Sequence, residues 1–389
     1  MRVALAADTI TQDDLAALSE WVLTGSRLTK GPETLAFERE FADRIGSRNA
    51  VFVNSGSSAN LLMVDALKES GRLRNRTAIV PAISWATTVT PFLQLGFETI
   101  LCDADPDTLG LDIDHLEQLI ARHDPSVLAL VHVLGHANRT DDVRELCETH
   151  DVHVLEDACE ALGSVGPHGR HLGTIGTAGS FSLYFGHHLS TIEGGVVVTD
   201  DDELHALLVA MRSHGWARDL EPDVRKRLAE RHSVDNFREL YTFYYPGYNL
   251  RATDLQAFIG RRQIKRLDEI VLARKRIHDR YRANLAGYYA QTSDTPVLSP
   301  FAYGTLVTAP AAVAAELARN GIESRPLICG NIGRHPFWLD RFGPTELPVA
   351  DQIHSHGMYL PIHAGMDEGD VDLVTSSLLA VAEPYDLKR

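Results

Sequence analysis

The chain has 389 residues, of which 44% are hydrophobic and 23% are charged, the composition of an ordinary globular protein. This composition argues against a disordered, collagen-like or coiled-coil protein. Asp and Glu outnumber Lys and Arg by 53 to 37, which gives a net charge of −16. Because an acidic chain repels phosphate backbones, no nucleic-acid partner is expected.

Cysteine usage and hydropathy indicate the compartment. The cysteines are Cys102, Cys147, Cys159 and Cys329, with no closely spaced pair among them. A disulfide framework, a metal site and an iron–sulfur cluster are therefore not expected. The N-terminus lacks the basic region and apolar run of a signal peptide, and no stretch approaches the roughly 18 apolar residues of a membrane span. We expect a cytoplasmic protein without a membrane partner.

Short apolar runs alternate with amphipathic segments through the first half of the chain. The expected strands are residues 50–54, 77–81, 98–103, 127–133, 152–156, 179–183 and 195–199. The expected helices between them are residues 58–69, 112–122, 140–150 and 203–213. Alternating helices and continuously apolar strands predict an α/β fold with a mainly parallel seven-stranded sheet, covered on both faces.

The second half of the chain begins with a charge-dense segment, residues 216–238, which is expected to form an exposed excursion. An aromatic run precedes a long helical pattern at residues 253–288. The remaining expected elements are strand 304–310 and helix 311–320 of a smaller α+β lobe. We therefore expect a large domain at residues 1–252, and a linking helix with a small C-terminal domain at residues 253–389.

Polar motifs follow several expected strands at their carboxyl ends, where open α/β sheets bind ligands. Residues 54–58, Asn-Ser-Gly-Ser-Ser, open a helix; its first amides and the hydroxyls either bind an anion or only cap the helix. Residues 156–160, Glu-Asp-Ala-Cys-Glu, end a strand, and an acid there either pairs with a cofactor ring nitrogen or caps the next helix. Two further polar motifs are residues 180–195 and 246–256.

Taken in order, these motifs resemble the pyridoxal-phosphate (PLP) dependent sugar aminotransferases of the DegT/DnrJ/EryC1/StrS family. The resemblance covers nearly the whole chain; the further matching segments are residues 81–88, 103–106, 131–135, 212–215 and 360–363. It implies the fold type I architecture, with a large PLP-binding domain and a smaller C-terminal domain. It also implies a homodimer with active sites shared across the interface.

The resemblance implies a role for individual residues. Those expected to hold the cofactor phosphate are Gly56, Ser57 and Ser182. Trp85 is expected to stack on the pyridine ring, and Asp157 to pair with the ring nitrogen, which makes the ring a better electron sink. Glu160 stands at the position near the ring hydroxyl, and Asn249 is expected to reach the cofactor phosphate of the neighbouring subunit.

His187 stands where aminotransferases of this family have the lysine that binds the cofactor covalently. Imidazole is not a primary amine and cannot form that Schiff base, and no lysine occurs between Lys68 and Lys226. A degenerate, inactive paralogue or a point mutant would also lack the lysine. The segments that instead resemble a branch of the family, the deoxysugar 3-dehydratases, are residues 186–188, 240–247 and 325–331. A sister enzyme on CDP-sugars adds an iron–sulfur cluster, which the scattered cysteines do not support.

The 3-dehydratase resemblance implies a noncovalent cofactor that resides as pyridoxamine phosphate (PMP). The expected reaction removes the C3 hydroxyl of a nucleotide-linked 4-keto-6-deoxyhexose, GDP-4-keto-6-deoxymannose in the colitose branch, releases ammonia and uses L-glutamate to restore the amine. His187 is expected to be the base, with the adjacent His188 as the alternative for either proton transfer. Further candidates for contacts to the substrate or donor are His214, Arg251 and Arg325, each equally suited to a structural salt bridge.

Two other functions stay open. An ordinary sugar aminotransferase would hold its cofactor covalently, which borohydride reduction detects. A non-enzymatic, ligand-binding regulator would bind cofactor or sugar without turnover. The resemblance alone favours GDP over CDP or dTDP as the nucleotide.

Overall fold

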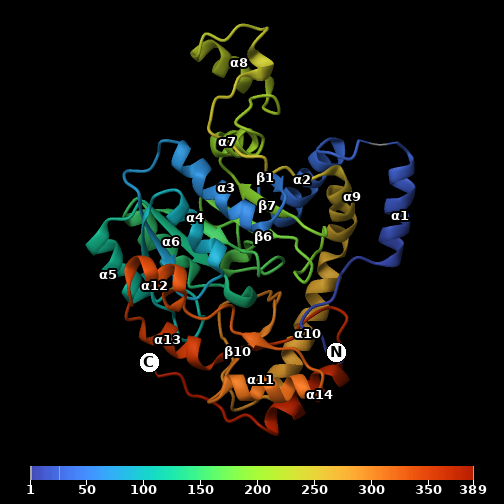
Figure 1. The fold of residues 1–389 in the computed structure, drawn as a ribbon, viewed down its shortest axis with the longest axis vertical. Coiled ribbons are helices and arrows are strands. Elements are labelled where there is room, and N and C mark those ends of the chain that lie inside the picture. Colours follow the sequence, from blue (N-terminus) through green and yellow to red (C-terminus); the bar gives the residue numbers. More distant parts are fainter. Residues whose placement is uncertain (1, 26, 389) are drawn as a thin grey trace.

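The computed structural model describes residues 2–25 and 27–388, and a seven-stranded sheet in the order β1-β7-β6-β5-β4-β2-β3 lies at its centre (Figure 1). The strands are β1 (Asn49–Val53), β2 (Thr77–Pro81), β3 (Glu98–Cys102), β4 (Val127–Val131), β5 (His153–Asp157), β6 (Ala178–Ser182) and β7 (Gly195–Thr199). Only β7 runs antiparallel to its neighbours in this sheet, β1 and β6. The predicted α/β fold is confirmed, and every strand expected in this sheet lies within two residues of its predicted bounds.

Helices cover both faces of this sheet because its strands are apolar on both sides. In β1, Val51 and Val53 pack into the core on one face, while Ala50 and Phe52 pack into the core on the other. The helices on the first face are α3 (Gly56–Glu69), α4 (Ala86–Gln94) and α7 (Asp202–Arg212). The helices on the second face are α2 (Pro32–Ile45), α5 (Ile113–His123) and α6 (Thr140–Thr149). The core therefore has two layers, with the sheet between them.

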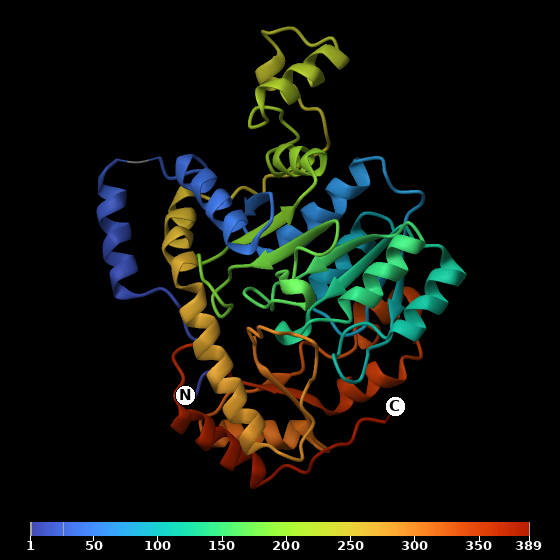
Figure 2. The same ribbon diagram turned by 180° about the vertical axis from the view of Figure 1, so that it is seen from behind.

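A long rod of two helices leads from the large sheet to the smaller lobe (Figure 2). Its parts are α9 (Asp254–Gln263) and α10 (Leu267–Asn284), joined by a 3₁₀ turn at Ile264–Arg266. Thr253 caps α9, since its hydroxyl accepts the amide of Gln256 at 3.2 Å. The long helix expected at residues 253–288 thus forms in two segments.

The smaller lobe contains an antiparallel sheet in the order β8-β10-β9. Its elements are β8 (Tyr303–Leu306), β9 (Arg325–Pro326), β10 (Gly357–Leu360), α11 (Pro310–Arg319), α12 (Pro336–Phe342), α13 (Pro348–His356) and α14 (Glu368–Leu379). The expected strand 304–310 ends at Leu306, because Pro310 is better suited to open a helix. The α+β lobe is confirmed, whereas the boundary at residue 252 stays a prediction, since residues such as Leu327 and Trp338 pack into the large core.

The N-terminal segment belongs structurally to the smaller lobe. Val3 forms a parallel bridge to Ile322, and the amides of Arg2 and Val3 donate to the carbonyl of Gly321 at 2.8 and 3.0 Å. The chain then passes to α1 (Gln12–Leu23), which lies beside α9 at one side of the molecule (Figures 1 and 2). The residues from 2 to 6 are called the N-terminal arm below.

The charge-dense segment projects from the rest of the molecule, as expected. Helix α8 (Pro222–Arg231) has no buried residue and stands clear of the sheet (Figure 1). The residues after it expose large apolar side chains, with Phe237 at 90% and Tyr241 at 76% of their maximal surface. Within residues 2–25 and 27–388, no helix is long and apolar enough to cross a membrane.

Candidate active site

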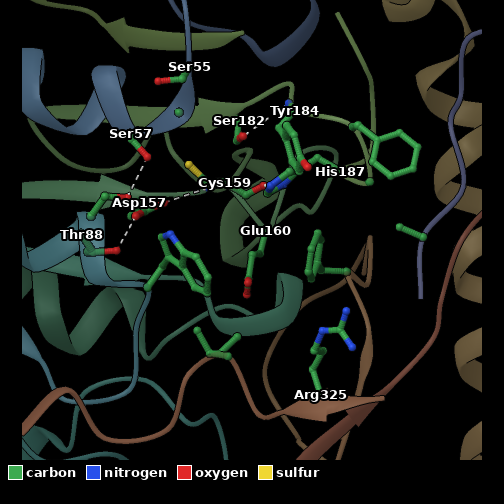
Figure 3. Close-up of a pocket in the computed structure, with 18 of the residues that line it drawn as sticks. Ser55, Ser57, Thr88, Asp157, Cys159, Glu160, Ser182, Tyr184, His187 and Arg325 are labelled. Atoms are coloured by element: carbon green, nitrogen blue, oxygen red, sulfur yellow. Dashed lines mark hydrogen bonds between the residues drawn. The ribbon is translucent and has the colours of Figure 1, made fainter. Parts of the chain in front are cut away.

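A cavity of about 730 Å³ lies at the carboxyl ends of the central parallel strands. Val131 ends β4, Asp157 ends β5 and Ser182 ends β6, and all three line this cavity. Its other walls include the starts of α3 and α4, the loop after β6, the N-terminal arm, and strands β9 and β10. Figure 3 shows the labelled side chains around this space. The cavity therefore lies between the large sheet and the smaller lobe.

The N-terminus of α3 forms one end of the cavity. Ser55 caps the helix, since its Oγ accepts the amide of Ser58 at 3.0 Å. A Cβ on Gly56 would lie 2.6 Å from Cβ of Ser182, so only glycine lets the start of α3 meet the end of β6. The first amides of a helix have no partner within it and carry partial positive charge. With the hydroxyls of Ser57 and Ser182 beside them, they can bind a phosphate group.

Asp157 presents a buried carboxylate to the cavity. Asn60 Nδ2 and Thr88 Oγ1 donate to its Oδ2 at 2.8 and 2.7 Å, and the amide of Cys159 donates to Oδ1 at 3.1 Å (Figure 3). These donors fix the orientation of the carboxylate and stabilise its charge. An ionised carboxylate only accepts hydrogen bonds, so its natural ligand is a donor such as a protonated ring nitrogen. Trp85, 57% exposed before α4, also lines the cavity.

Glu160 lies close to Asp157 in the same wall. The amide of Leu134 donates to its Oε2 at 2.9 Å. Burial, with the nearby charge of Asp157, raises the pKa of Glu160 to about 8. Its carboxyl group is therefore protonated at neutral pH and can donate a hydrogen bond to an oxygen of a bound molecule.

His187 lies on the loop after β6 and lines the cavity (Figure 3). Its Nδ1 is 2.9 Å from the carbonyl oxygen of Cys159. Because a carbonyl only accepts, Nδ1 carries the proton, and Nε2 of the uncharged ring has a free lone pair. Burial lowers the pKa of His187 to about 4, and its ring packs 5.0 Å from that of Phe301. The imidazole is therefore an uncharged base at neutral pH.

The structure brings most of the predicted site residues into one cavity. Those that line it are Gly56, Ser57, Trp85, Asp157, Glu160, Ser182, His187 and Arg325. Arg325, in β9, lies on the side of the cavity opposite Ser57 (Figure 3). A carboxylate oxygen of Glu323 lies 3.6 Å from its guanidinium. Their individual roles stay predictions.

His188 lies behind the cavity wall. Its side chain is fully buried, and its Nε2 is 3.0 Å from the carbonyl oxygen of Ser299. Burial and the charge of Arg274 hold its pKa well below the usual value for histidine. This position favours the alternative in which His188 only packs and hydrogen-bonds, and it offers no contact to a substrate.

Three predicted residues lie outside the cavity wall of their own chain. The ring of His214 packs 5.1 Å from that of Trp216, and Arg251 pairs with Val53 at the end of β1. Asn249 is exposed, and its main chain pairs with Ser213. An exposed Asn249 is compatible with a contact to a second subunit, which stays a prediction.

Several cavity residues were not expected from the sequence. The N-terminal arm contributes Ala4, Leu5 and Ala6. The amide of Leu5 donates to Glu323 Oε2 at 2.8 Å, which ties the arm to the smaller lobe. Asn60 was also missed, although it follows Gly56 by four residues and so lies on the same face of α3.

The residues present fit PLP at three points. The close approach of Gly56 to Ser182 forms a cradle that would hold its phosphate, Asp157 could accept a hydrogen bond from its ring nitrogen, and Trp85 offers an aromatic face. Within the described part of the chain, no group of three or more His, Cys, Asp or Glu side chains could hold a metal ion. A doubly wound sheet with this cradle and this carboxylate defines a PLP-dependent enzyme of fold type I.

Comparison with known proteins supports this class. Residues 8–379 match the DegT/DnrJ/EryC1/StrS aminotransferase family, and the chain belongs to this family. It is 34% identical over 372 residues to the GDP-4-keto-6-deoxy-D-mannose 3-dehydratase of Yersinia pseudotuberculosis, an alignment that covers 92% of this chain and 93% of the relative. The predicted family, the resemblance to its 3-dehydratases and the PLP or PMP cofactor are thereby confirmed: this is a PLP-dependent, sugar-modifying enzyme.

Two solved structures show the same architecture. A histidine-to-asparagine mutant of GDP-4-keto-6-deoxymannose-3-dehydratase with bound GDP-perosamine matches with a TM-score of 0.89 and 30% identity over 97% of this chain and 100% of that one. The same dehydratase with a trapped PLP–glutamate geminal diamine matches with a TM-score of 0.87 and 29% identity over 97% of this chain and 100% of that one. The fold type I assignment is confirmed over nearly the whole chain.

Proposed function

We propose that this enzyme catalyses C3 dehydration of a nucleotide-linked 4-keto-6-deoxyhexose, GDP-4-keto-6-deoxymannose, and that L-glutamate restores the PMP form of its cofactor. The observation that carries the proposal is His187, an uncharged imidazole in the cavity with Asp157. None of the described residues that line the cavity is a lysine. The name of the Yersinia relative and the PLP–glutamate adduct in the solved dehydratase support the substrate and the donor.

Proton transfer is the task of His187 in this proposal. When bound, PMP supplies an electron sink joined to the sugar next to C3, and Asp157 strengthens the sink by accepting the ring N–H. The free Nε2 of His187 would accept the proton lost from the carbon that bears the amine of the cofactor. Because its pKa is held to about 4, the imidazolium is a ready acid that returns the proton, and the departing C3 hydroxyl is the group that needs it.

Arg325 is proposed as the contact for an anionic group of substrate or donor. It lines the cavity from the smaller lobe, across from the phosphate cradle at Ser57 (Figure 3). A guanidinium can grip a phosphate or a carboxylate through two parallel hydrogen bonds. His214 and Arg251 can serve this role only in a site completed by a second chain, since neither lines the cavity of its own chain.

We also propose that the enzyme is a homodimer whose active sites lie at the interface. Support comes from Asn249, which is exposed, and from Phe237 and Tyr241, large apolar side chains that project from the excursion. Light scattering and bound PLP measured across a dilution series test this assembly. A fully occupied, active monomer would refute it.

The reaction is tested with purified protein, PLP, L-glutamate and a panel of GDP-, CDP- and dTDP-4-keto-6-deoxyhexoses, with products identified by mass. The expected product is the 3-deoxy-4-keto sugar with release of ammonia, formed fastest from the GDP substrate. A 4-amino sugar would instead show an aminotransferase, and binding without any product would show an inactive ligand-binding paralogue. Faster dehydration of the CDP or dTDP sugar would contradict only the proposed identity of the nucleotide, GDP.

A further inference from the structure

A fully buried arginine lies directly behind the cavity. Arg274, on α10, is only 1% exposed. Its Nη1 donates to the carbonyls of Pro300, Phe301 and Ile362 at 3.3, 3.1 and 2.9 Å. Its Nη2 donates to the carbonyl of His187 at 3.1 Å. One guanidinium thus joins two other chain segments, residues 300–301 and Ile362, to the residue proposed as the base.

These contacts hold His187 from two sides. Arg274 binds the main chain of His187 itself, and it binds the main chain of Phe301, whose ring packs 5.0 Å from the imidazole. The imidazole is then oriented by the Cys159 carbonyl at Nδ1, which leaves Nε2 as its free nitrogen. Loss of the guanidinium would release the backbone below the imidazole and the ring against which it packs.

Arg274 is a buried charge without an acidic partner. No carboxylate among the described residues shifts its pKa, and its Nε has no hydrogen-bond partner there. Burial lowers the pKa of Arg274 to about 10, so it still carries a full charge at neutral pH. An uncompensated buried cation costs several kcal/mol in stability. Neutral backbone carbonyls alone do not require a cation, which points to a role for the charge.

The charge acts on the histidines around it. The titratable groups that face or adjoin His187 are Asp157, Cys159, Glu160, Tyr184, His188 and Arg274. Burial is the largest cause that lowers the pKa of His187, His188 and His363, and the charge of Arg274 lowers it further. Asp157 acts in the opposite direction on His187. Two positive charges so close in a medium of low dielectric constant repel each other strongly.

We propose that Arg274 is a positioning residue for the reaction: its guanidinium fixes the main chain of His187 and that of Phe301, and it places a positive charge beside the imidazole. The proposal rests on the proposed role of His187 as the base. The proposal assigns a function to the buried charge. When His187 has taken a proton, the positive charge of Arg274 repels the imidazolium, so the proton is readily returned.

The test compares three variants. Arg274→Met removes the donors and the charge, Arg274→Lys keeps the charge with fewer donors, and Arg276→Met removes an exposed arginine from the same helix. Two quantities are measured for each: the dependence of kcat and kcat/KM for dehydration on pH, and the titration midpoint of His187. The midpoint comes from NMR of protein labelled at histidine, with the signal assigned by its loss in His187→Asn.

In the parent protein, we expect His187 to stay uncharged down to about pH 5. In Arg274→Met, the titration midpoint of His187 should rise by roughly one pH unit, and the acid limb of the pH profile of kcat/KM should move with it. The value of kcat should fall on the order of tenfold, because the base is no longer held in place. Arg274→Lys should return the midpoint to the parent value while kcat stays reduced. Arg276→Met should leave the midpoint and kcat unchanged.

Several outcomes would overturn the proposal. A parent midpoint near 6.5, the usual pKa of histidine, shows that no such constraint acts on His187. An unchanged midpoint in Arg274→Met, or equal midpoints in the Lys and Met variants, removes the charge from the explanation. If Arg274→Met does not fold, Arg274→Gln, which keeps hydrogen-bond donors without the charge, replaces it in the comparison with Arg274→Lys. Absence of dehydration in the parent protein overturns the proposed function instead, because the NMR titration needs no substrate.

Discussion

At the scale of single residues, His187 and Asp157 face the same cavity, and the proposed reaction needs an uncharged His187 and a negatively charged Asp157. Asp157 accepts hydrogen bonds from three donors, whereas burial keeps His187 uncharged. A charged acceptor and an uncharged base at the same site suit a reaction in which electrons move toward a ring while a proton is taken and returned.

Replacement of His187 tests its role. His187→Lys is expected to lose dehydration and to hold the cofactor covalently, because lysine supplies the primary amine that imidazole lacks. His187→Asn should keep noncovalent cofactor and lose dehydration. The mass of borohydride-treated protein, the visible spectrum and product formation distinguish the two. Dehydration by the Asn variant at the parent rate would show that the base lies elsewhere.

Asp157→Asn should separate binding from chemistry. The phosphate cradle at Gly56 and the aromatic face of Trp85 remain in this variant, so the cofactor should stay bound. Without the negative charge opposite the ring nitrogen, turnover should fall at least about a hundredfold, equivalent to roughly 2.7 kcal/mol in the activation barrier. Cofactor absorbance and steady-state rates measure the two effects. Near-normal turnover removes Asp157 from the electron-sink role.

Glu160 should make the stability of the cofactor-free protein depend on pH. Its pKa is about 8 in the folded protein but has the ordinary value of a glutamate when unfolded. Between these values the folded state binds one more proton than the unfolded state, so the free energy of unfolding falls as pH rises. Glu160→Gln removes this loss and should raise the Tm by roughly 2 °C or more at about pH 8, with no gain near pH 4. Equal Tm differences at both pH values would contradict a raised pKa.

At the scale of elements, the contact between α3 and β6 forms the phosphate cradle. Gly56→Ala adds a Cβ 2.6 Å from that of Ser182, which should separate the two elements and weaken PLP binding on the order of tenfold. Gly369→Ala is the matched control, because Gly369 lies in the first turn of α14, where its Cβ would approach only the Asp367 side chain. Fluorescence titration with PLP measures the affinities, and unchanged binding in Gly56→Ala would place the phosphate elsewhere.

The elements that sequence patterns predicted are those whose signal is local. Several strands of the large sheet are short apolar runs, such as Val127–Val131 and Gly195–Thr199, in which all five residues are buried. Helix α4 gave no such signal, because its threonines and Pro91 are poor helix formers. Packing of Val89 and Phe92 on the core overrides this weak propensity.

The site divides in the same way. Asp157 and His187 stand in motifs of consecutive residues, so their presence in one cavity was predictable from their order and resemblance. Leu5 was not, because its link to the cavity is a hydrogen bond to Glu323, 318 positions away in the chain. Likewise, the contacts of Arg274 are with main-chain carbonyls, which leave no pattern in the sequence.

At the scale of the whole molecule, the proposed interface can be tested by mixing two inactive variants. His187→Asn and Asn249→Ala each damage the site, but a mixed dimer contains one site with His187 from one chain and Asn249 from the other. After mixing under conditions that exchange subunits, up to about a quarter of the parent activity should return if the two chains share each site. No recovery, despite mixed dimers in native mass spectrometry, would show that Asn249 serves its own chain.

The pairing of the N-terminal arm with the smaller lobe has a consequence for biosynthesis. During translation Val3 leaves the ribosome well before its partner Ile322 and the cavity residue Arg325. The strands of the large sheet are complete by Thr199, so that sheet can form while the arm still lacks its partner. Closure of the cavity is therefore among the last events of folding, and a nascent chain that stops before residue 322 has a sheet but no complete cofactor pocket.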